Sequence, residues 1–344
     1  MWIWDKKKDA ERSLKNYFSL DNFPEIKGYD FEKNFDFKEF LKSYKNMGFQ
    51  GSNLGAAISI FQEIIEKKVP LYISFTGNMI SSGNRELIAY LVKNNHVKAI
   101  VTTASAIEED IIKCIKPFHL GSFEIKGSFL LENLIGRIGN IFVPADRYVY
   151  LERFINEVFK NIYKQQKEKN KIFSTHGLAG EIGLYIEKNE YTSKKCKESF
   201  LYWASKNKIL VFCPGITDGT LGDISVFFKR NHQDFVIDIT EDNKFLTSML
   251  MNEETAASLI LGGGISKHFL LNAAIFRDGF EYSIYLTTAQ EFDGSDSGGD
   301  QEEAISWSKI KPNAKRIKVV ADATITFPLL ISSIIKKRII EPTH

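Results

Sequence analysis

The sequence predicts the α/β fold class, with a doubly wound, mainly parallel sheet covered by helices on both faces. Short apolar runs rich in β-branched or aromatic residues alternate with helix-like segments of about 10–15 residues. Each run is bounded by Gly, Ser, Thr, Asn or Asp. No internal repeat, low-complexity tract or proline-rich linker divides the chain. Strands that alternate with helices in this way form parallel sheets that are buried on both faces.

The predicted elements follow one another along the chain. Residues 1–27 are dense in Lys, Asp and Glu and are predicted to be an N-terminal extension, whereas residues 28–344 form a single α/β domain. Residues 37–68 have apolar positions at helical spacing, with a predicted turn at residues 48–53. The predicted strands are residues 71–76, 98–103, 209–213, 235–239, 258–261, 282–286 and 317–320.

The composition describes a folded globular protein. The chain has 344 residues, of which 44% are hydrophobic, and its net charge of +2 indicates no general attraction to nucleic acid. We find neither a signal peptide nor the roughly 18 uninterrupted apolar residues of a membrane span. The three cysteines lack metal-ligand spacing and form no even-numbered disulfide set. We therefore expect a cytoplasmic protein that binds no nucleic acid, membrane or metal.

The segments that follow the predicted strands are candidates for a ligand site. Ligands of open α/β sheets bind outside the carboxyl ends of the strands. Six such segments are rich in small residues and carboxylates, so we expect them to converge on one site. These segments are residues 76–82, 102–109, 214–223, 262–268, 287–293 and 321–323.

Residues 291–309 are the most informative segment of the chain. This Gly/Ser-rich loop contains three aspartates, three glutamates, one tryptophan and one lysine. Carboxylates neutralise a multiply charged amine, and the indole of Trp307 can hold an alkylammonium by a cation–π contact of roughly 0.5–2 kcal/mol. Lys309, crowded by ammonium groups and partly desolvated, would lose affinity for its proton and become a nucleophile toward a C=N or C=O carbon. The alternative interpretation is a solvated acidic loop.

A glycine run and a histidine lie in another of these segments. Gly262-Gly-Gly264 allows close approach of a ligand to the backbone, although such runs also form plain tight turns. His268 is either a structural residue or a general base near neutral pH. The chain has no GxGxxG motif, so the predicted fold is Rossmann-like without the ordinary dinucleotide fingerprint.

Two pairs of carboxylates complete the set of candidates. Asp218 and Asp223 flank a predicted tight turn, where one suits ribose hydroxyls and the other an ammonium group. Glu108 and Glu109 are at the start of a helical pattern. They either complement the helix dipole or bind a ligand.

Several strings of residues together resemble the deoxyhypusine synthase family. The resemblance extends from about Gly28 to about Ile334, in the family's order and spacing. The strings that carry it are residues 78–83, 108–114, 137–144, 217–223, 261–264, 288–298 and 303–309.

The resemblance implies roles for individual residues. Lys309 would form a covalent imine, His268 would act as the base on the polyamine, and Trp307 would pack along it. The implied polyamine site is completed by Glu108, Glu109, Asp223, Gly294, Ser295, Asp296 and Glu303. The implied NAD site consists of Gly77, Asn78, Ser81, Thr103, Ala104, Asp218, Gly263, Thr288, Ala289, Asp293, Ala321 and Asp322.

The resemblance also implies a reaction and partners. An NAD-dependent transferase of this family moves the 4-aminobutyl group of spermidine to a lysine of the hypusine-containing translation factor. The implied assembly is a homotetramer with sites at dimer interfaces. Alternatives are a homospermidine synthase, which uses putrescine as the acceptor with the same residues, and a catalytically silent regulatory homologue.

Three features remain open at this stage. Ser105-Ala106 stands where the family usually has Gly-Gly, and Gly77 stands where it usually has Ser. Both differences lie near the implied nucleotide site. The resemblance implies that the apolar tip Trp2-Ile-Trp4 would plug the active-site entrance of a neighbouring subunit, as an N-terminal helix does in some relatives. The alternative is a frayed terminus or a helix packed on its own subunit.

Overall fold

The computed structural model describes residue 20 and residues 22–335 of the chain. The proposed plug at residues 2–4 therefore lies outside the described residues. The chain separates into two compact units, Met1–Gly55 and Ala56–His344. That residues 28–344 act as one catalytic domain stays a prediction.

The first unit contains a short helix and an aromatic cluster. Helix α2 (Phe37–Ser43) begins where the side chain of Asp36 accepts a hydrogen bond from the backbone N–H of Glu39. The ring of Tyr29 lies with its centroid 5.1–5.8 Å from those of Phe31, Phe35 and Phe40. The cluster therefore ties the segment before α2 to the helix itself.

The helical pattern predicted for residues 37–68 is confirmed, but the predicted turn at residues 48–53 is too long. The 3-10 helix η1 (Tyr44–Asn46) follows α2, and α3 (Phe49–Glu66) begins in the first unit and continues into the second. Only Gly48, with φ +81°, and Phe49, with φ +47°, have left-handed backbone there. Helical hydrogen bonding then continues through residues 50–53 despite their turn-like composition.

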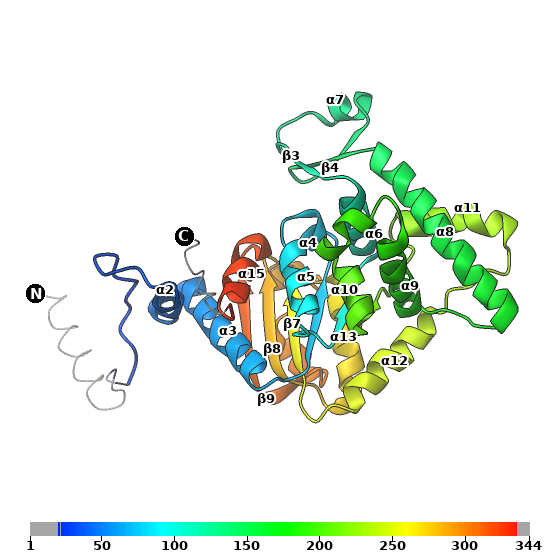
Figure 1. Ribbon diagram of the computed structural model, residues 1–344. Helices are drawn as coiled ribbons and strands as arrows, with labels where there is room; N and C mark the ends of the chain where they lie inside the picture. The colour runs from blue at the N-terminus through cyan, green and yellow to red at the C-terminus, as the bar shows by residue number, and fades with distance from the viewer. Residues whose placement is uncertain (1–19, 21, 336–344) are drawn as a thin grey trace, which may run out of the picture. The chain divides into compact units, whose positions relative to one another are not determined.

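The second unit is built on a six-stranded parallel sheet (Figure 1). Its order is β6-β2-β1-β7-β8-β9, so the chain adds strands on one side of β1 and then returns to add strands on the other. This order confirms the predicted doubly wound α/β fold. The strands are β1 (Leu71–Phe75), β2 (Ala99–Val101), β6 (Leu210–Phe212), β7 (Ala257–Leu261), β8 (Phe280–Thr287) and β9 (Ile310–Val320).

Six of the seven predicted strands are present. The prediction of a strand at residues 235–239 is wrong. Residues 235–239 contribute only an isolated bridge between Ile237 and Phe173. The side chain of Asp238 accepts hydrogen bonds from the N–H groups of Thr240 and Glu241, which starts helix α12 (Ile239–Met251). The apolar run therefore ends in a helix cap instead of continuing as a strand.

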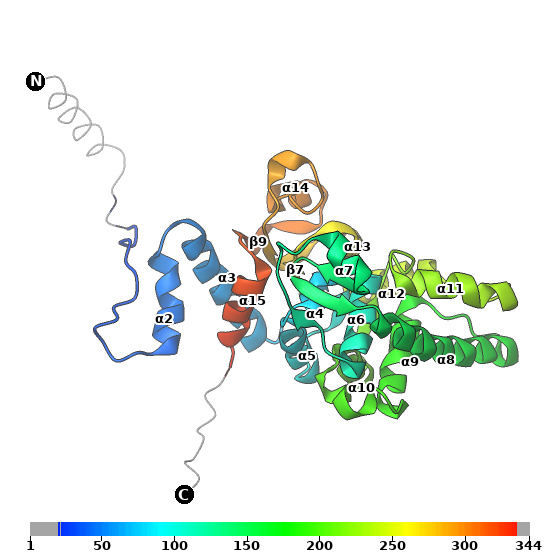
Figure 2. The same ribbon diagram turned by 90° about the horizontal axis from the view of Figure 1, so that it is seen from above.

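Helices cover both faces of the sheet. Figure 2 shows α5 on one side, and α12 and α13 on the other. Right-handed crossovers impose this division, because the direction in which strands are added reverses at β1. The helices of the second unit not yet given are α4 (Asn78–Ser81), α5 (Arg85–Lys93), α6 (Ala104–Ile115), α7 (Gly127–Glu132), α8 (Asp146–Lys169), α9 (Thr175–Lys188), α10 (Phe200–Asn207), α11 (Thr220–Asn231), α13 (Gly264–Ala274), α14 (Gln301–Ser306) and α15 (Ala323–Ser332), with the 3-10 turns η2 (Ser193–Glu198), η3 (Ile275–Arg277) and η4 (Glu291–Asp293).

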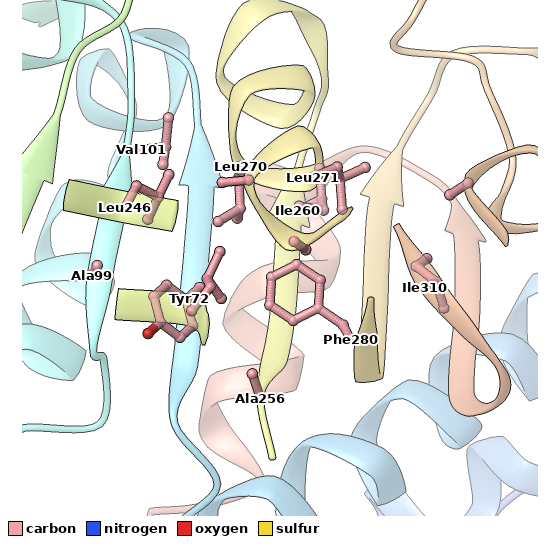
Figure 3. Close-up of a cluster of buried hydrophobic side chains, with 14 of the residues drawn as sticks. Tyr72, Ala99, Val101, Leu246, Ala256, Ile260, Leu270, Leu271, Phe280 and Ile310 are labelled. Atoms are coloured by element: carbon pink, nitrogen blue, oxygen red, sulfur yellow. The ribbon is translucent and has the colours of Figure 1, made fainter. Parts of the chain in front are cut away.

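A continuous core lies between the sheet and the helices of its second face (Figure 3). Tyr72, Ile260 and Phe280 from three strands contact Leu270 and Leu271 of α13, and all are essentially inaccessible to solvent. Burial of one such side chain contributes about 1.5–3 kcal/mol. This core holds α13, which carries His268, firmly on the sheet.

A second, smaller sheet was not predicted. It is antiparallel, with the order β3-β5-β4, and contains β3 (His119–Leu120), β4 (Ile135–Ile138) and β5 (Ile141–Pro144). Large apolar side chains around it are exposed, among them Leu120, Phe123, Leu131 and Leu134. No helix among the described residues is long and apolar enough to cross a membrane.

Candidate active site

All six post-strand segments lie at one edge of the large sheet. This follows directly from the parallel direction of all six strands, because their carboxyl ends must then point the same way. The order of strands reverses between β1 and β7, which places the loops at Gly77 and Gly263 on either side of the reversal. Such a reversal is where open α/β sheets bind their ligands. The prediction that the segments lie at one edge of the sheet is confirmed, and their convergence on one site stays a prediction.

The glycine run after β7 is required by its backbone and by close packing. Gly262 and Gly264 have φ values of +86° and +67°, which residues with a side chain rarely adopt. A Cβ atom on Gly263 would lie 2.3 Å from the Cα atom of Ser297. The run therefore lets the acidic loop lie directly against the start of α13.

Two adjacent glutamates of α6 are buried. Glu108 accepts a hydrogen bond of 2.7 Å from the N–H of Leu221, and Glu109 accepts one of 2.5 Å from the Ser81 hydroxyl. Burial raises the pKa of both carboxyls to about 7, and the charges of Asp218 and Asp223 add to the rise at Glu108. Helix α6 begins at Ala104, so neither glutamate belongs to its first turn. Simple complementarity to the helix dipole therefore does not explain them.

Residues of three loops are joined beside these glutamates. The Thr103 hydroxyl accepts a hydrogen bond of 3.1 Å from the N–H of Gly77 and lies 2.9 Å from the Ser105 hydroxyl. The N–H of Ala104 donates to Asp218 over 3.2 Å. The two departures from the family pattern are Gly77 and Ser105-Ala106, and Gly77 thus lies against Ser105.

A second group surrounds the start of α13. The Nδ1 atom of His268 lies 2.9 Å from the Oδ1 atom of Asp296. Lys267, which is buried, donates to the backbone carbonyls of Asp296 and Gly299. Burial lowers the pKa of Lys267, the carboxylates of Asp296 and Glu303 oppose this effect, and the positive charges of Lys318 and Lys309 add to it. The sequence analysis did not identify Lys267 as a candidate. The only signal in the sequence that could have identified it is its position next to His268.

Lys309 is held at the junction of α14 and β9. Its N–H donates to the carbonyl of Ala304 over 2.9 Å, and its carbonyl accepts from Phe280 over 3.2 Å. Unlike the post-strand candidates, it therefore precedes a strand. Trp307, two residues earlier, is 63% exposed, and Glu303 is also exposed.

The remaining candidates are near the ends of β8 and β9. Asp293 accepts hydrogen bonds from the N–H and the hydroxyl of Ser295, over 2.9 and 2.7 Å, and these lower its pKa. Asp322 caps α15 by accepting from the N–H of Thr324 over 2.7 Å. Other candidates in these loops are Thr288, Ala289, Gly294 and Ala321, of which Gly294 has φ +70°.

Most of the candidates thus fall into two groups. The first contains Glu108, Glu109 and the residues joined to them around α4, α6 and α11. The second contains His268, Lys309 and the acidic loop around α13 and α14. Within the described part of the chain, no hydrogen bond or ion pair joins a candidate of one group to a candidate of the other.

The sheet order and the loops at its reversal define a doubly wound α/β protein with a charged, carboxylate-rich site. A sequence model described as deoxyhypusine synthase matches residues 39–334. A protein of Methanocaldococcus jannaschii, described as "Probable deoxyhypusine synthase", is 43% identical over 319 residues, which cover 90% of this chain and 96% of that protein. The deoxyhypusine synthase of Arabidopsis thaliana is 39% identical over 89% of each chain.

A solved structure agrees with these matches. A crystal structure from Entamoeba histolytica, described as "a putative deoxyhypusine synthase", superposes with a TM-score of 0.62 at 26% identity and covers 90% of this chain and 96% of that one. The chain belongs to the deoxyhypusine synthase family, and its members are transferases.

Proposed function

We propose that this chain transfers the 4-aminobutyl group of spermidine to a lysine of the hypusine-containing translation factor through an imine on Lys309. The observation that carries the proposal is the contact between His268 and Asp296. This contact supports the proposal because a histidine held by a carboxylate, in the same group as Lys309, suits a general base. Membership of the family supports the reaction type.

The chemistry assigns one task to each residue. Bound NAD would accept a hydride from the carbon beside the secondary amine of spermidine and return it in the last step. His268 takes the proton of that amine, so that a C=N bond forms. The uncharged amine of Lys309 adds to this bond and expels 1,3-diaminopropane, which leaves the four-carbon fragment on Lys309. The acceptor lysine then displaces Lys309 and carries the fragment away.

The carboxylates suit a polyamine. We assign its binding to Glu108, Glu109, Asp223, Asp296 and Glu303, with Trp307 along its alkyl chain and Gly294 and Ser295 in the adjoining turn. Two buried carboxyls with pKa values near 7 are poorly stabilised as anions in the free protein. An ammonium group placed between them would favour their ionised form. The two carboxylates repel each other in the free protein, and both would attract the ammonium group of the ligand.

The loops at the strand reversal suit a dinucleotide. We assign NAD to this place because the sheet has the strand order of dinucleotide-binding proteins and its loops at the reversal are rich in small residues. The residues assigned to NAD are Gly77, Asn78, Ser81, Thr103, Ala104, Asp218, Gly263, Thr288, Ala289, Asp293, Ala321 and Asp322.

We also propose that a second copy of the chain completes each site, in a homotetramer. The two groups of candidates are not joined within one chain, and the second group faces solvent. The side chain of His268 is 52% exposed, Trp307 is 63% exposed and Phe292 is 95% exposed. Burial against a partner would withdraw these groups from water, as the reactive imine requires. A cytoplasmic location would follow from an acceptor that acts in translation.

An assay with spermidine and NAD tests the function. Purified chain is given either the translation factor or putrescine as the acceptor, and release of 1,3-diaminopropane is measured. We expect release together with labelling of the translation factor. Transfer to putrescine alone would identify a homospermidine synthase, and no release with either acceptor would identify a silent homologue.

A further inference from the structure

Helix α6 begins in an unusual way. Thr103 is its N-cap residue, yet the Thr103 side chain makes no capping hydrogen bond to the helix. The hydroxyl instead binds the N–H of Gly77, in the loop after β1, and lies 2.9 Å from the hydroxyl of Ser105. A threonine at this position normally stabilises the helix by capping it. Here a helix cap is replaced by a connection between two loops.

Ser105 occupies the space beside Gly77. A Cβ atom on Gly77 would lie 2.3 Å from the Ser105 hydroxyl oxygen and 2.7 Å from its Cβ atom. Both distances are shorter than real Cβ contacts. A side chain at position 77 and the Ser105 side chain therefore exclude each other.

The connection lies at the strand reversal. β1 and β2 are neighbours in the sheet, and the loop after β1 borders the reversal. The N–H of Ala104, between Thr103 and Ser105, donates to Asp218 in the loop after β6. Thr103, Ala104 and Ser105 thus link the first turn of α6 to the loops after β1 and β6. Helix N-termini and nearby backbone amides bind the phosphates of dinucleotides in such folds.

We propose that Ser105 is a cofactor-positioning residue. Its hydroxyl holds the Thr103 side chain in the orientation that binds the Gly77 amide, and this keeps the loop after β1 in the shape that receives the dinucleotide. The inference rests on the proposed function, because it assigns a task at the same nucleotide site. Without the Ser105 hydroxyl, Thr103 is free to cap α6, and the loop at Gly77 loses its partner.

The first test compares Ser105→Ala with Ser205→Ala. Ser205 is also half-buried, but its hydroxyl binds the backbone carbonyl of Gly180 and it lies in α10, away from the candidates. Binding of NADH is measured by fluorescence titration of the full chain without spermidine, and thermal unfolding is measured alongside. We expect Ser105→Ala to weaken NADH binding about threefold to tenfold, the effect of one hydrogen bond, with no loss of thermal stability. Equal NADH affinity in both variants would overturn the proposal.

The second test exchanges the two side chains. Gly77→Ser alone should weaken NADH binding at least tenfold, because its side chain meets Ser105. The double variant Gly77→Ser with Ser105→Gly should regain most of that affinity, since the hydroxyl now comes from the other loop. A double variant that binds no better than Gly77→Ser would contradict the proposal. A native chain that binds no NADH would instead overturn the proposed function, so the two failures are distinguishable.

Discussion

The Nδ1 atom of His268 on α13 lies 2.9 Å from the Oδ1 atom of Asp296 in the acidic loop that follows β8. This contact orients the imidazole, because the carboxylate engages Nδ1 and leaves Nε2 for a substrate proton. The neighbouring Lys267 holds the same loop through the carbonyls of Asp296 and Gly299. One turn of helix thus positions both the proposed base, His268, and the carboxylate that contacts it.

Replacing Asp296 by Asn should weaken spermidine binding while NAD binding changes little. The substitution removes one charge from an ammonium site, which costs on the order of 2–5 kcal/mol when the pair is desolvated. Glu303→Gln should act in the same direction. Glu302→Gln is the matched control, because Glu302 is exposed on the same helix and pairs with Arg316. Calorimetric titration with spermidine measures the difference. Unchanged affinity in Asp296→Asn and Glu303→Gln would leave a solvated acidic loop as the better interpretation.

Lys309 should be the residue that becomes covalently labelled. With spermidine labelled in its four-carbon segment, borohydride added during turnover should fix the label on Lys309, as peptide mass mapping would show. Lys309→Arg should keep the charge and lose transfer, because a guanidinium stays protonated and cannot form the imine. Lys311→Arg, two residues away, is the control. Label found on any other lysine contradicts the assignment.

The buried glutamates should make stability depend on pH. The carboxyl of Glu109 ionises near pH 4.5 in an unfolded chain and near 7 in the folded one, because burial raises its pKa. The folded state therefore binds more protons between these values, and its stability should fall as the pH rises from about 4.5 to about 7 and then level off. Glu109→Gln should remove part of this loss and stabilise the free protein at pH 8 by roughly 1–3 kcal/mol.

The same variant should lose affinity for spermidine. Thermal unfolding between pH 4.5 and 8 checks the stability, and spermidine titration at pH 8 checks the binding. Glu132→Gln serves as a control, because it replaces an exposed glutamate at the end of α7. A Glu109→Gln protein with the pH dependence of the native chain would show that Glu109 ionises normally.

Asp110 should be essential for stability and not for binding. It is fully buried, its Oδ1 atom accepts from Arg85 Nε over 2.7 Å, and its Oδ2 atom accepts from Ser199 and Leu201. Asp110→Ala leaves the Arg85 charge buried without this partner, so unfolding should become easier by about 3–5 kcal/mol. Glu86→Gln, which removes a 3.7 Å pair between Arg85 and an exposed carboxylate, should change stability by less than about 1 kcal/mol. Urea unfolding distinguishes the two, and similar midpoints would refute the assignment.

Local pattern was enough to predict the fold class and most of the sheet. The strands β1, β2, β6, β7 and β8 are buried almost throughout, so their residues are mostly apolar. An apolar run between helical segments can be recognised from consecutive residues alone. β9 was predicted only at residues 317–320 because its earlier part is polar. As a strand that pairs only with β8, it can be partly exposed, so it needs no apolar pattern. The strand predicted at residues 235–239 was wrong because an apolar run is present there without forming a strand. The run ends at Asp238, whose carboxylate caps α12.

The candidate residues were recognisable from the sequence because their chemistry and spacing are local. Which of them meet is a property of the tertiary structure. The order of the strands in the sheet, and not nearness in the sequence, brings together the residues of three pairs. These pairs are Ser81 and Glu109, Glu108 and Leu221, and Asp218 and Ala104. The mutual exclusion of a side chain at position 77 and the Ser105 side chain could not be seen either, because it depends on the close packing of two residues 28 positions apart. The sequence by itself determined the side chains that can do the chemistry. The tertiary structure decided their burial, and with it the pKa values of Glu108 and Glu109, because desolvation depends on the atoms that surround a group in space.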